Sequence, residues 1–177
     1  MKIAILGNGR MGKRINELAI ERGHTIVCIS SSDKPAHTLD LSTADVAIDF
    51  STPTTAFENI RHALNSGTPV ISGTTGWLEK LKVVKDLCQT KKGAFLYASN
   101  FSLGVNLFFE LNKKLARLIK NQNYESSLHE IHHTQKLDSP SGTAKTLGEQ
   151  MDEILASNTP ITAERTGDFP GTHIITY

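Results

Sequence analysis

The sequence predicts an α/β protein in two parts: a doubly wound parallel sheet over residues 1–100, then a second, α+β domain over residues 101–177. Three observations support this. Five short apolar runs alternate with helix-like segments before residue 100. A glycine-rich turn follows the first run, and the hydrophobic period changes after Asn100. Alternating strands and helices are typical of a parallel sheet covered by helices.

The five runs are short and bounded by turn residues, as expected for strands buried on both faces. They cover residues 2–6, 25–29, 46–50, 70–71 and 94–97. Helices are expected around residues 15–22, 56–64 and 78–91, and Thr52 and Pro53 open the second of them. Residues 30–43 have no clear apolar stripe, so we expect an irregular crossover there.

The part after Asn100 begins with a long helix whose leucines share one stripe: Leu103, Leu107, Leu111, Leu115 and Leu118. A strand over residues 124–132, a helix over 141–155 and a strand over 173–177 follow. A domain of about 75 residues whose last strand ends at the terminus buries little surface. We therefore expect the second domain to be incomplete at its C-terminus, as in a truncated chain.

Composition narrows the class of protein. The net charge of +1 and the 38% hydrophobic content indicate an ordinary globular chain, with no nucleic acid or membrane as partner. No run reaches the ~18 apolar residues of a membrane span, and the first residues are too short a run for a signal peptide. Cys28 and Cys88 lack CxxC spacing and are expected to be reduced core thiols, which predicts a cytoplasmic location.

The turn after the first strand, residues 7–12, reads GNGRMG and fits the pattern GxGxxG. Gly7 permits the tight turn, Gly9 lets the backbone approach a pyrophosphate, and Gly12 lets helix and strand pack closely. The helix start offers free N–H groups and a positive dipole end to phosphates. A turn without a ligand is the alternative, but the strand–turn–helix context favours a Rossmann-type dinucleotide site.

The end of the second strand is expected to bind the adenosine ribose. An acidic residue there would select NAD. Ser31 and Ser32 stand there instead, followed by Asp33 and Lys34. Serine hydroxyls and a lysine suit a 2′-phosphate, whereas Asp33 suits a bare ribose. The sequence therefore leaves both NADH and NADPH open, beside the alternative of a polar surface loop.

Two further segments, residues 49–53 and 73–76, follow the third and fourth strands. In an open α/β sheet the carboxyl ends of the strands form the ligand crevice. Phe50, Gly73 and Thr75 are therefore expected to line the nicotinamide end of the cofactor site.

Residues 129–144 form the densest polar cluster. On a strand, Glu130 and His132 share one face, while His129 and His133 share the other. Alternation thus separates the histidines, and no cysteine lies close, so we expect no metal. A solvated polar loop is the other alternative.

The end of this cluster predicts an anion site. Ser141 is a good N-cap, so Gly142 and Thr143 begin a helix with donors free for a carboxylate. An imidazole, the Lys136 ammonium and this helix start then meet in one loop. Such a set suits an anionic substrate that takes up a proton during reduction.

With these residues in view, the chain resembles the 4-hydroxy-tetrahydrodipicolinate reductase family, also called dihydrodipicolinate reductases, of lysine and diaminopimelate biosynthesis. The resemblance runs along the whole chain. It rests on residues 9–12, 49–51, 73–76, 100–106, 130–144, 165–167 and 170–173.

The resemblance implies roles for individual residues. His132 would donate a proton, Lys136 would stabilise the developing negative charge, and His133 with Gly142 and Thr143 would hold the dicarboxylate. The residues that would line the cofactor, NADH or NADPH, are Gly7, Arg10, Met11, Gly73, Thr75, Ser99 and Phe101.

The resemblance also implies an assembly and two departures. Family members are usually homotetramers built through the second domain, so a homotetramer is expected if the C-terminal part is present. They commonly carry an acidic or basic residue where Ser31 and Ser32 stand, and they continue past Tyr177. The alternatives are another Rossmann amino-acid dehydrogenase, of homoserine or aspartate type, and a dinucleotide-binding regulator without turnover.

Overall fold

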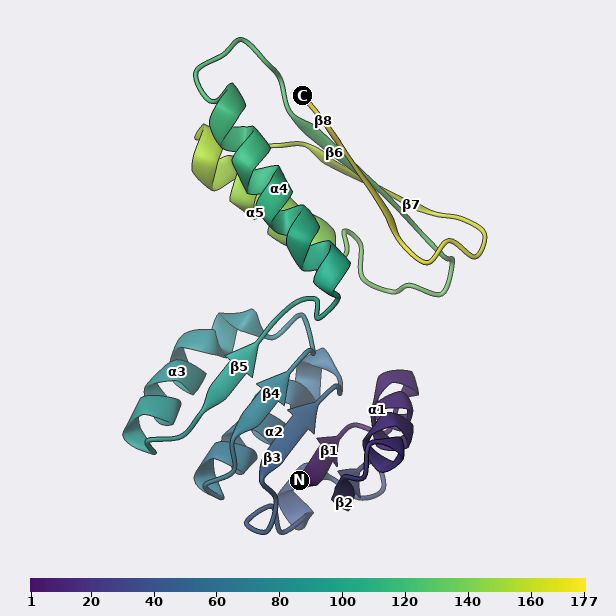
Figure 1. Ribbon diagram of the computed structural model, residues 1–177, viewed down its shortest axis with the longest axis vertical. Helices are drawn as coiled ribbons and strands as arrows, with labels where there is room; N and C mark the ends of the chain where they lie inside the picture. The colour runs from purple at the N-terminus through teal and green to yellow at the C-terminus, as the bar shows by residue number, and fades with distance from the viewer. The chain divides into compact units, whose positions relative to one another are not determined.

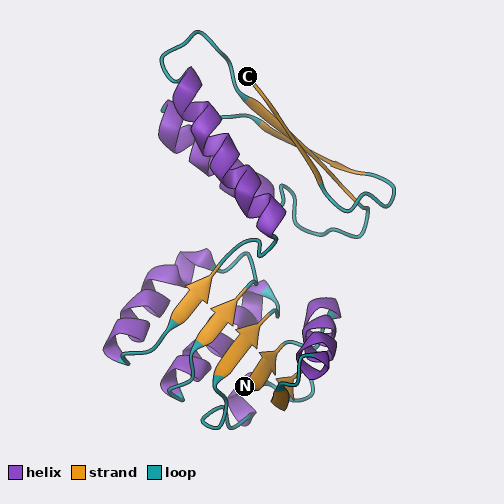
Figure 2. Ribbon diagram, in the orientation of Figure 1, coloured by secondary structure: helices purple, strands orange, loops and turns teal.

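The computed structural model describes residues 1–177, which divide into two compact units, Met1–Ala98 and Ser99–Tyr177 (Figure 1). In the first unit, five parallel strands, labelled in Figure 1 and coloured orange in Figure 2, lie in the order β2-β1-β3-β4-β5. Their bounds are β1 Lys2–Leu6, β2 Thr25–Ser30, β3 Val46–Asp49, β4 Val70–Ser72 and β5 Phe95–Tyr97. This confirms the parallel sheet expected from the five apolar runs.

Helices cover both faces of this sheet, as alternation along β1 requires. Ile3 and Ile5 pack on one face with Ala19 of α1 (Arg10–Glu21). Ala4 and Leu6 face the opposite way, into a core shared with α2 (Pro53–Asn65) and α3 (Leu81–Thr90). Successive strand residues point to opposite faces, so the side chains of β1 alternate between the two helix layers. The sheet is therefore doubly wound.

The connections differ in regularity. Between β2 and β3 the chain forms only a single 3-10 turn, η1 (Ala36–Thr38), which confirms the irregular crossover. A second 3-10 turn, η2 (Leu78–Lys80), precedes α3. Pro53 occupies the first turn of α2, where its missing N–H costs nothing.

The second unit is a three-stranded mixed sheet with two helices. Its elements are α4 Leu103–Ile119, β6 Ser127–His132, α5 Gly142–Leu155, β7 Ile161–Arg165 and β8 Thr172–Thr176. β6 is central, parallel to β7 and antiparallel to β8. Figure 1 shows both helices on one side of the sheet. The core joins Phe109 of α4, Leu128 of β6, and Ala144 and Leu147 of α5.

The leucine stripe of α4 does not enter this core. Leu103, Leu107, Leu111, Leu115 and Leu118 are all exposed. The buried side of the helix instead carries Phe109, Asn112 and Ala116. No helix of the structure has the length and apolar character needed to cross a membrane.

Candidate active site

A pocket of about 740 Å³ lies in the first unit where the direction of winding reverses, between β1 and β3. Ligands of open α/β sheets bind at such a switch point. Its volume lies within the range of small-molecule and cofactor sites. Loops after β1, β2 and β3 and the start of α2 contribute its lining: Gly7, Asn8, Gly9, Ser30, Ser31, Ser32, Asp33, Pro35, Ala36, His37, Phe50, Ser51, Thr52, Thr54, Thr55, Glu58 and Asn59.

The glycines of the turn after β1 suit a dinucleotide. Gly7 has φ +117°, and a Cβ there would overlap the carbonyl oxygen of Phe50. A Cβ at Gly12 would overlap the carbonyl oxygen of Gly7, so glycine permits the close helix–strand packing. Gly9 has open space within 4 Å of an added Cβ, and no side chain caps α1 there. The first amides of α1 are thus available to a pyrophosphate.

The loop after β2 forms a closed turn at the pocket wall. The Ser31 amide donates to the Lys34 carbonyl at 2.9 Å, and the Lys34 amide donates to Ser31 Oγ at 3.2 Å. Ser32 and Asp33 also line the pocket, whereas Lys34 is not among the lining residues. Ser30, which carried no role in the sequence interpretation, accepts a hydrogen bond from the Gly7 amide at 3.0 Å and ties the two loops together.

A buried carboxylate organises the ends of β3 and β4. Asp49 is fully buried. Its Oδ1 accepts hydrogen bonds from Ser51 Oγ at 2.7 Å and Asn59 Nδ2 at 3.1 Å. Its Oδ2 accepts from Ser72 Oγ at 2.9 Å and Thr74 Oγ1 at 2.7 Å. These four hydrogen bonds fix the loop of residues 73–76 against the loop after β3.

The other predicted cofactor residues are not among those that line this pocket. Arg10 and Met11 occupy the first turn of α1. Gly73 packs so closely on the Phe50 ring that a Cβ would overlap it, and Thr75 is half-buried in the same loop. Ser99 and Phe101 belong to the second unit, where Ser99 Oγ lies 3.0 Å from Thr146 Oγ1.

The second unit places its polar cluster on the helix-facing side of the sheet. Glu130 and His132 of β6 are buried, whereas His129 and Ile131 are only half-buried, which confirms the predicted alternation. Their neighbours across the sheet are His173, opposite Glu130 on β8, and Arg165, opposite His132 on β7. Neither neighbour had been assigned a role, because strand pairing is not visible in a single sequence.

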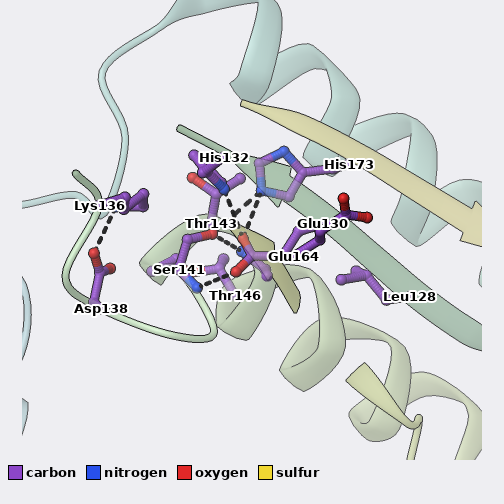
Figure 3. A network of polar contacts seen from close by, with 12 residues as sticks. Leu128, Glu130, His132, Lys136, Asp138, Ser141, Thr143, Thr146, Glu164 and His173 are labelled. Carbon is purple, nitrogen blue, oxygen red and sulfur yellow. Dashed lines mark hydrogen bonds and ion pairs between the residues drawn. The ribbon is translucent and has the colours of Figure 1, made fainter. Parts of the chain in front are cut away.

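Glu130 is the centre of this cluster (Figure 3). Its Oε1 accepts from the Ser141 amide and from Arg165 Nη2, each at 2.9 Å. Its Oε2 lies 3.2 Å from His132 Nδ1 and 3.5 Å from His173 Nε2. The Glu130 side chain is fully buried, so all its partners come from the protein.

Burial and charge act in opposite directions on these groups. Burial alone would raise the pKa of Glu130, but hydrogen bonds from Ser141 and Arg165 and the charge of His132 bring that pKa below its ordinary value. Burial lowers the pKa of His132, and the nearby Lys136 and Arg165 lower it further, against the opposing effect of Glu130. Burial and His132 likewise lower the pKa of His173. The cluster thus favours an ionised Glu130 beside neutral imidazoles.

The loop between β6 and α5 carries the predicted anion site. Ser141 caps α5, since its hydroxyl accepts from the Ala144 amide at 3.2 Å, and Gly142 and Thr143 form the first turn. Lys136 Nζ lies 2.6 Å from Asp138 Oδ1, so an internal carboxylate already pairs with this ammonium (Figure 3). Asp138 had not been assigned a role.

His133 and Gly171 complete the surroundings. His133 follows the end of β6, and its amide donates to the Phe169 carbonyl at 2.8 Å. Gly171, in the turn before β8, packs against the His132 ring on the Nε2 side.

Glu130, His132 and His173 each bring one possible ligand atom within 4.8 Å of one another, close enough for a metal ion to bridge. The guanidinium of Arg165 already lies on the same carboxylate, and two positive charges there would repel. Glu130, His132 and His173 are therefore better suited to exchanging a proton than to binding a metal ion.

A Rossmann-type unit followed by an α+β unit with a histidine–carboxylate cluster defines a class of two-domain oxidoreductases. Two family models match nearly the whole chain: "Dihydrodipicolinate reductase, N-terminus" over residues 1–101 and "Dihydrodipicolinate reductase, C-terminus" over residues 104–177. The chain belongs to the dihydrodipicolinate reductase family.

Individual relatives agree with this family. The 4-hydroxy-tetrahydrodipicolinate reductase of Christiangramia forsetii is 48% identical over 190 residues, an alignment that covers 100% of this chain and 80% of that protein. The enzyme of the same name from Methanopyrus kandleri is 40% identical over 63% of this chain and 41% of its own length.

Solved structures share the fold. A dipicolinate-bound dihydrodipicolinate reductase from Paenisporosarcina sp. TG-14 matches with a TM-score of 0.72 and 23% identity, over 99% of this chain and 82% of that one. Aspartate semialdehyde dehydrogenase II of Vibrio cholerae, with a TM-score of 0.54 and 11% identity over 98% and 70% of the two chains, shares the fold alone. The alternatives of an amino-acid dehydrogenase and a regulator without turnover gain no support from these matches.

Proposed function

We propose that this chain reduces 4-hydroxy-tetrahydrodipicolinate to tetrahydrodipicolinate with NADH or NADPH, a step of lysine and diaminopimelate biosynthesis. The observation that carries the proposal is the buried His132, paired with Glu130 and followed within the same loop by Lys136 and the start of α5. A proton donor, an ammonium and anion-binding amides suit a substrate that carries two carboxylates and takes up a proton when its ring is reduced.

The substrate would be held by charge-assisted hydrogen bonds. The amides of Gly142 and Thr143 at the start of α5 bind one carboxylate, and the positive end of the helix dipole adds to this. Lys136 exchanges its internal partner Asp138 for the substrate, and His133 supports the second carboxylate. The relative from Paenisporosarcina sp. TG-14 is described as dipicolinate-bound, and dipicolinate carries two carboxylates of this kind.

His132 would act as the proton donor. Its Nδ1 faces Glu130, so Nε2 is the nitrogen left for the substrate. The nicotinamide, when bound, supplies the hydride. The turn of residues 7–12 would hold the dinucleotide, and Phe50, Gly73 and Thr75 would hold its nicotinamide end. Arg10, Met11, Ser99 and Phe101 would complete the set that the family resemblance implies.

Both cofactors are expected to bind. Ser31 and Ser32 offer hydroxyl groups to a 2′-phosphate, and Asp33 on the same pocket wall offers a carboxylate to the ribose hydroxyls. Titrations with NADPH and NADH, followed by fluorescence, should give dissociation constants within about tenfold of one another. A much stronger preference for NADH would assign the ribose to Asp33.

We infer that the enzyme works as a homotetramer. The exposed leucines of α4 support self-association, because a stripe of large apolar side chains is uncommon on the surface of a monomer. Sedimentation of the wild type and of a Leu107→Glu, Leu111→Glu variant tests this, and we expect the variant to sediment as a smaller species.

The decisive experiment on activity is His132→Ala, with His129→Ala as the matched control on the exposed face of the same strand. Oxidation of NADPH with the dihydrodipicolinate-pathway substrate should slow by about 10²–10⁴-fold in His132→Ala, and cofactor affinity should stay unchanged. The control should retain its turnover. Equal turnover in wild type and His132→Ala would remove His132 from the reaction.

A further inference from the structure

The two oxygens of the Glu130 carboxylate have unequal surroundings. Oε1 has two donors, the Ser141 amide and the Arg165 guanidinium. Oε2 has no hydrogen-bond partner of good geometry, and the same is true of His132 Nδ1, although both atoms are buried and only 3.2 Å apart. A buried anion oxygen without a donor is costly, and a small rotation of either side chain would join these two atoms.

This pairing decides which nitrogen of His132 carries the proton. An ionised carboxylate accepts hydrogen bonds and cannot donate them. His132 must therefore present Nδ1–H to Glu130, so the neutral ring leaves Nε2 bare and the cationic ring carries its second proton on Nε2. Arg165 and Ser141 hold the carboxylate from its far side, which fixes the direction of Oε2.

Gly171 is the neighbour of His132 on the side of Nε2, and a Cβ there would lie 2.9 Å from this nitrogen. It is the residue packed against that nitrogen, and it has no side chain to cover it. One ring nitrogen thus lies 3.2 Å from a fixed carboxylate, while the other lies next to a residue without a side chain.

We propose that Glu130 is a positioning residue that holds His132 in its Nδ1–H tautomer and stabilises the imidazolium form, so that Nε2 delivers the proton to the substrate. The proposal rests on the proposed function, since it concerns the same reaction. It adds a residue to that reaction and names the nitrogen that acts. Glu130 loses no proton itself; the proton leaves His132 Nε2 and the next one is taken up from solvent at the same atom.

The first test is Glu130→Gln, with Glu164→Gln as the matched control. Glu164 lies on the other face of the same sheet, 3.8 Å from His129 Nε2, and is half-exposed, so it repeats the glutamate–histidine pair away from the site. We expect Glu130→Gln to lower kcat by about 10²-fold or more, because an amide stabilises the wrong tautomer. Dipicolinate affinity should stay within about threefold, and the control should equal the wild type.

The pH profile separates this role from a merely structural one. His132 is faced by Glu130 on its own strand, Arg165 on β7, His173 on β8, and Lys136 and Asp138 in the following loop. The charge of Glu130 raises the pKa of His132, so we expect this pKa to be lower in Glu130→Gln. The limb on which kcat falls with rising pH should therefore move to lower pH in Glu130→Gln and stay in place in Glu164→Gln.

A second measurement uses the wild type alone and does not depend on the variant's folding. The ¹⁵N chemical shifts of the imidazole report which nitrogen is protonated, and we expect Nδ1–H for neutral His132. An Nε2–H tautomer, or normal kcat in Glu130→Gln, overturns the proposal. Turnover that is lost on adding a chelator also overturns it, since the three groups would then hold a metal. If the wild type does not reduce the substrate but shows the Nδ1–H tautomer, the proposed function fails and the pairing stands.

Discussion

A Cβ added at Gly171 would lie 2.9 Å from Nε2 of His132, and Gly171 itself has φ +136°. Two separate constraints therefore require glycine at this position. The backbone conformation is one that L-residues rarely adopt, and any side chain would press on the imidazole nitrogen to which we assign proton delivery. The turn between β7 and β8 thus contributes to the site through Gly171, whose lack of a side chain leaves the imidazole of His132 in place.

Gly171→Ala should lower turnover by about tenfold or more, because the methyl group covers Nε2 or pushes the ring away. Gly167→Ala is the matched control: Gly167 has φ +53° in the same turn, but a Cβ there meets only the Phe169 ring at 3.6 Å. Both variants should lose stability, by roughly 1 kcal/mol, from the strained backbone. Steady-state kinetics and urea unfolding separate the effects, and equal kinetic losses in the two variants would contradict the assignment.

Stability should fall as the solution becomes mildly acidic. Burial lowers the pKa of both His132 and His173 in the folded chain below the ordinary value of 6.5. The unfolded chain then binds protons first as the pH falls, so the free energy of unfolding decreases from about pH 6.5 down through the lowered folded values. Glu130 adds to this trend only below its own ordinary value of 4.5.

Urea unfolding at pH 7.5 and pH 5.5 checks this dependence. We expect a lower midpoint at pH 5.5 for the wild type and a smaller difference between the two pH values for His173→Asn. A wild-type midpoint that rises on acidification would mean that these histidines gain a proton on folding.

Lys136 and Asp138 should have opposite effects on binding of a dicarboxylate. Removing the ammonium in Lys136→Ala should weaken dipicolinate binding by about tenfold or more, since charge-assisted bonds contribute roughly 1.5–3 kcal/mol. Asp138→Asn frees the same ammonium from its internal partner and should tighten binding by up to about fivefold, the most that a partly exposed ion pair contributes. Isothermal calorimetry measures both, and weaker binding in Asp138→Asn would show that Asp138 orients Lys136 instead of competing with the ligand.

Asp49 should control cofactor affinity without contacting the cofactor. In Asp49→Asn one acceptor oxygen becomes an NH₂ group facing hydroxyl and amide donors, which loosens the loops of residues 49–53 and 73–76. We expect NADPH to bind about tenfold more weakly and dipicolinate to bind as before. Asp45→Asn, just before the same strand, is the control because its carboxylate accepts only from the exposed Lys2 amide. If the wild type and Asp49→Asn bind NADPH equally well, Asp49 has only a structural role.

The elements that sequence predicted well depend on local rules. The strands of the first unit follow from short apolar runs, the turn of residues 7–12 from its glycines, and the start of α5 from Ser141. The common face of Glu130 and His132 followed from alternation along one strand, whereas the burial of that face is seen only in the structure.

The parts that sequence did not predict depend on contacts between distant residues. β7, Ile161–Arg165, has an exposed central stretch and no apolar pattern, and pairing with β6 makes it a strand. Arg165 and His173 reach Glu130 only through strand pairing. The stripe on α4 was correctly placed on one helix face, but periodicity alone does not tell a buried face from an exposed one.

The exposed leucines of α4 also affect the calorimetry of the chain. Heat capacity rises on unfolding mainly because apolar surface becomes hydrated, by about 0.45 cal/mol/K for each Å². Leu103, Leu107, Leu111, Leu115 and Leu118 are already largely hydrated when the chain is folded as a single copy. They therefore add little to that rise, and a single folded copy should have a flatter curve of stability against temperature than its length of 177 residues suggests.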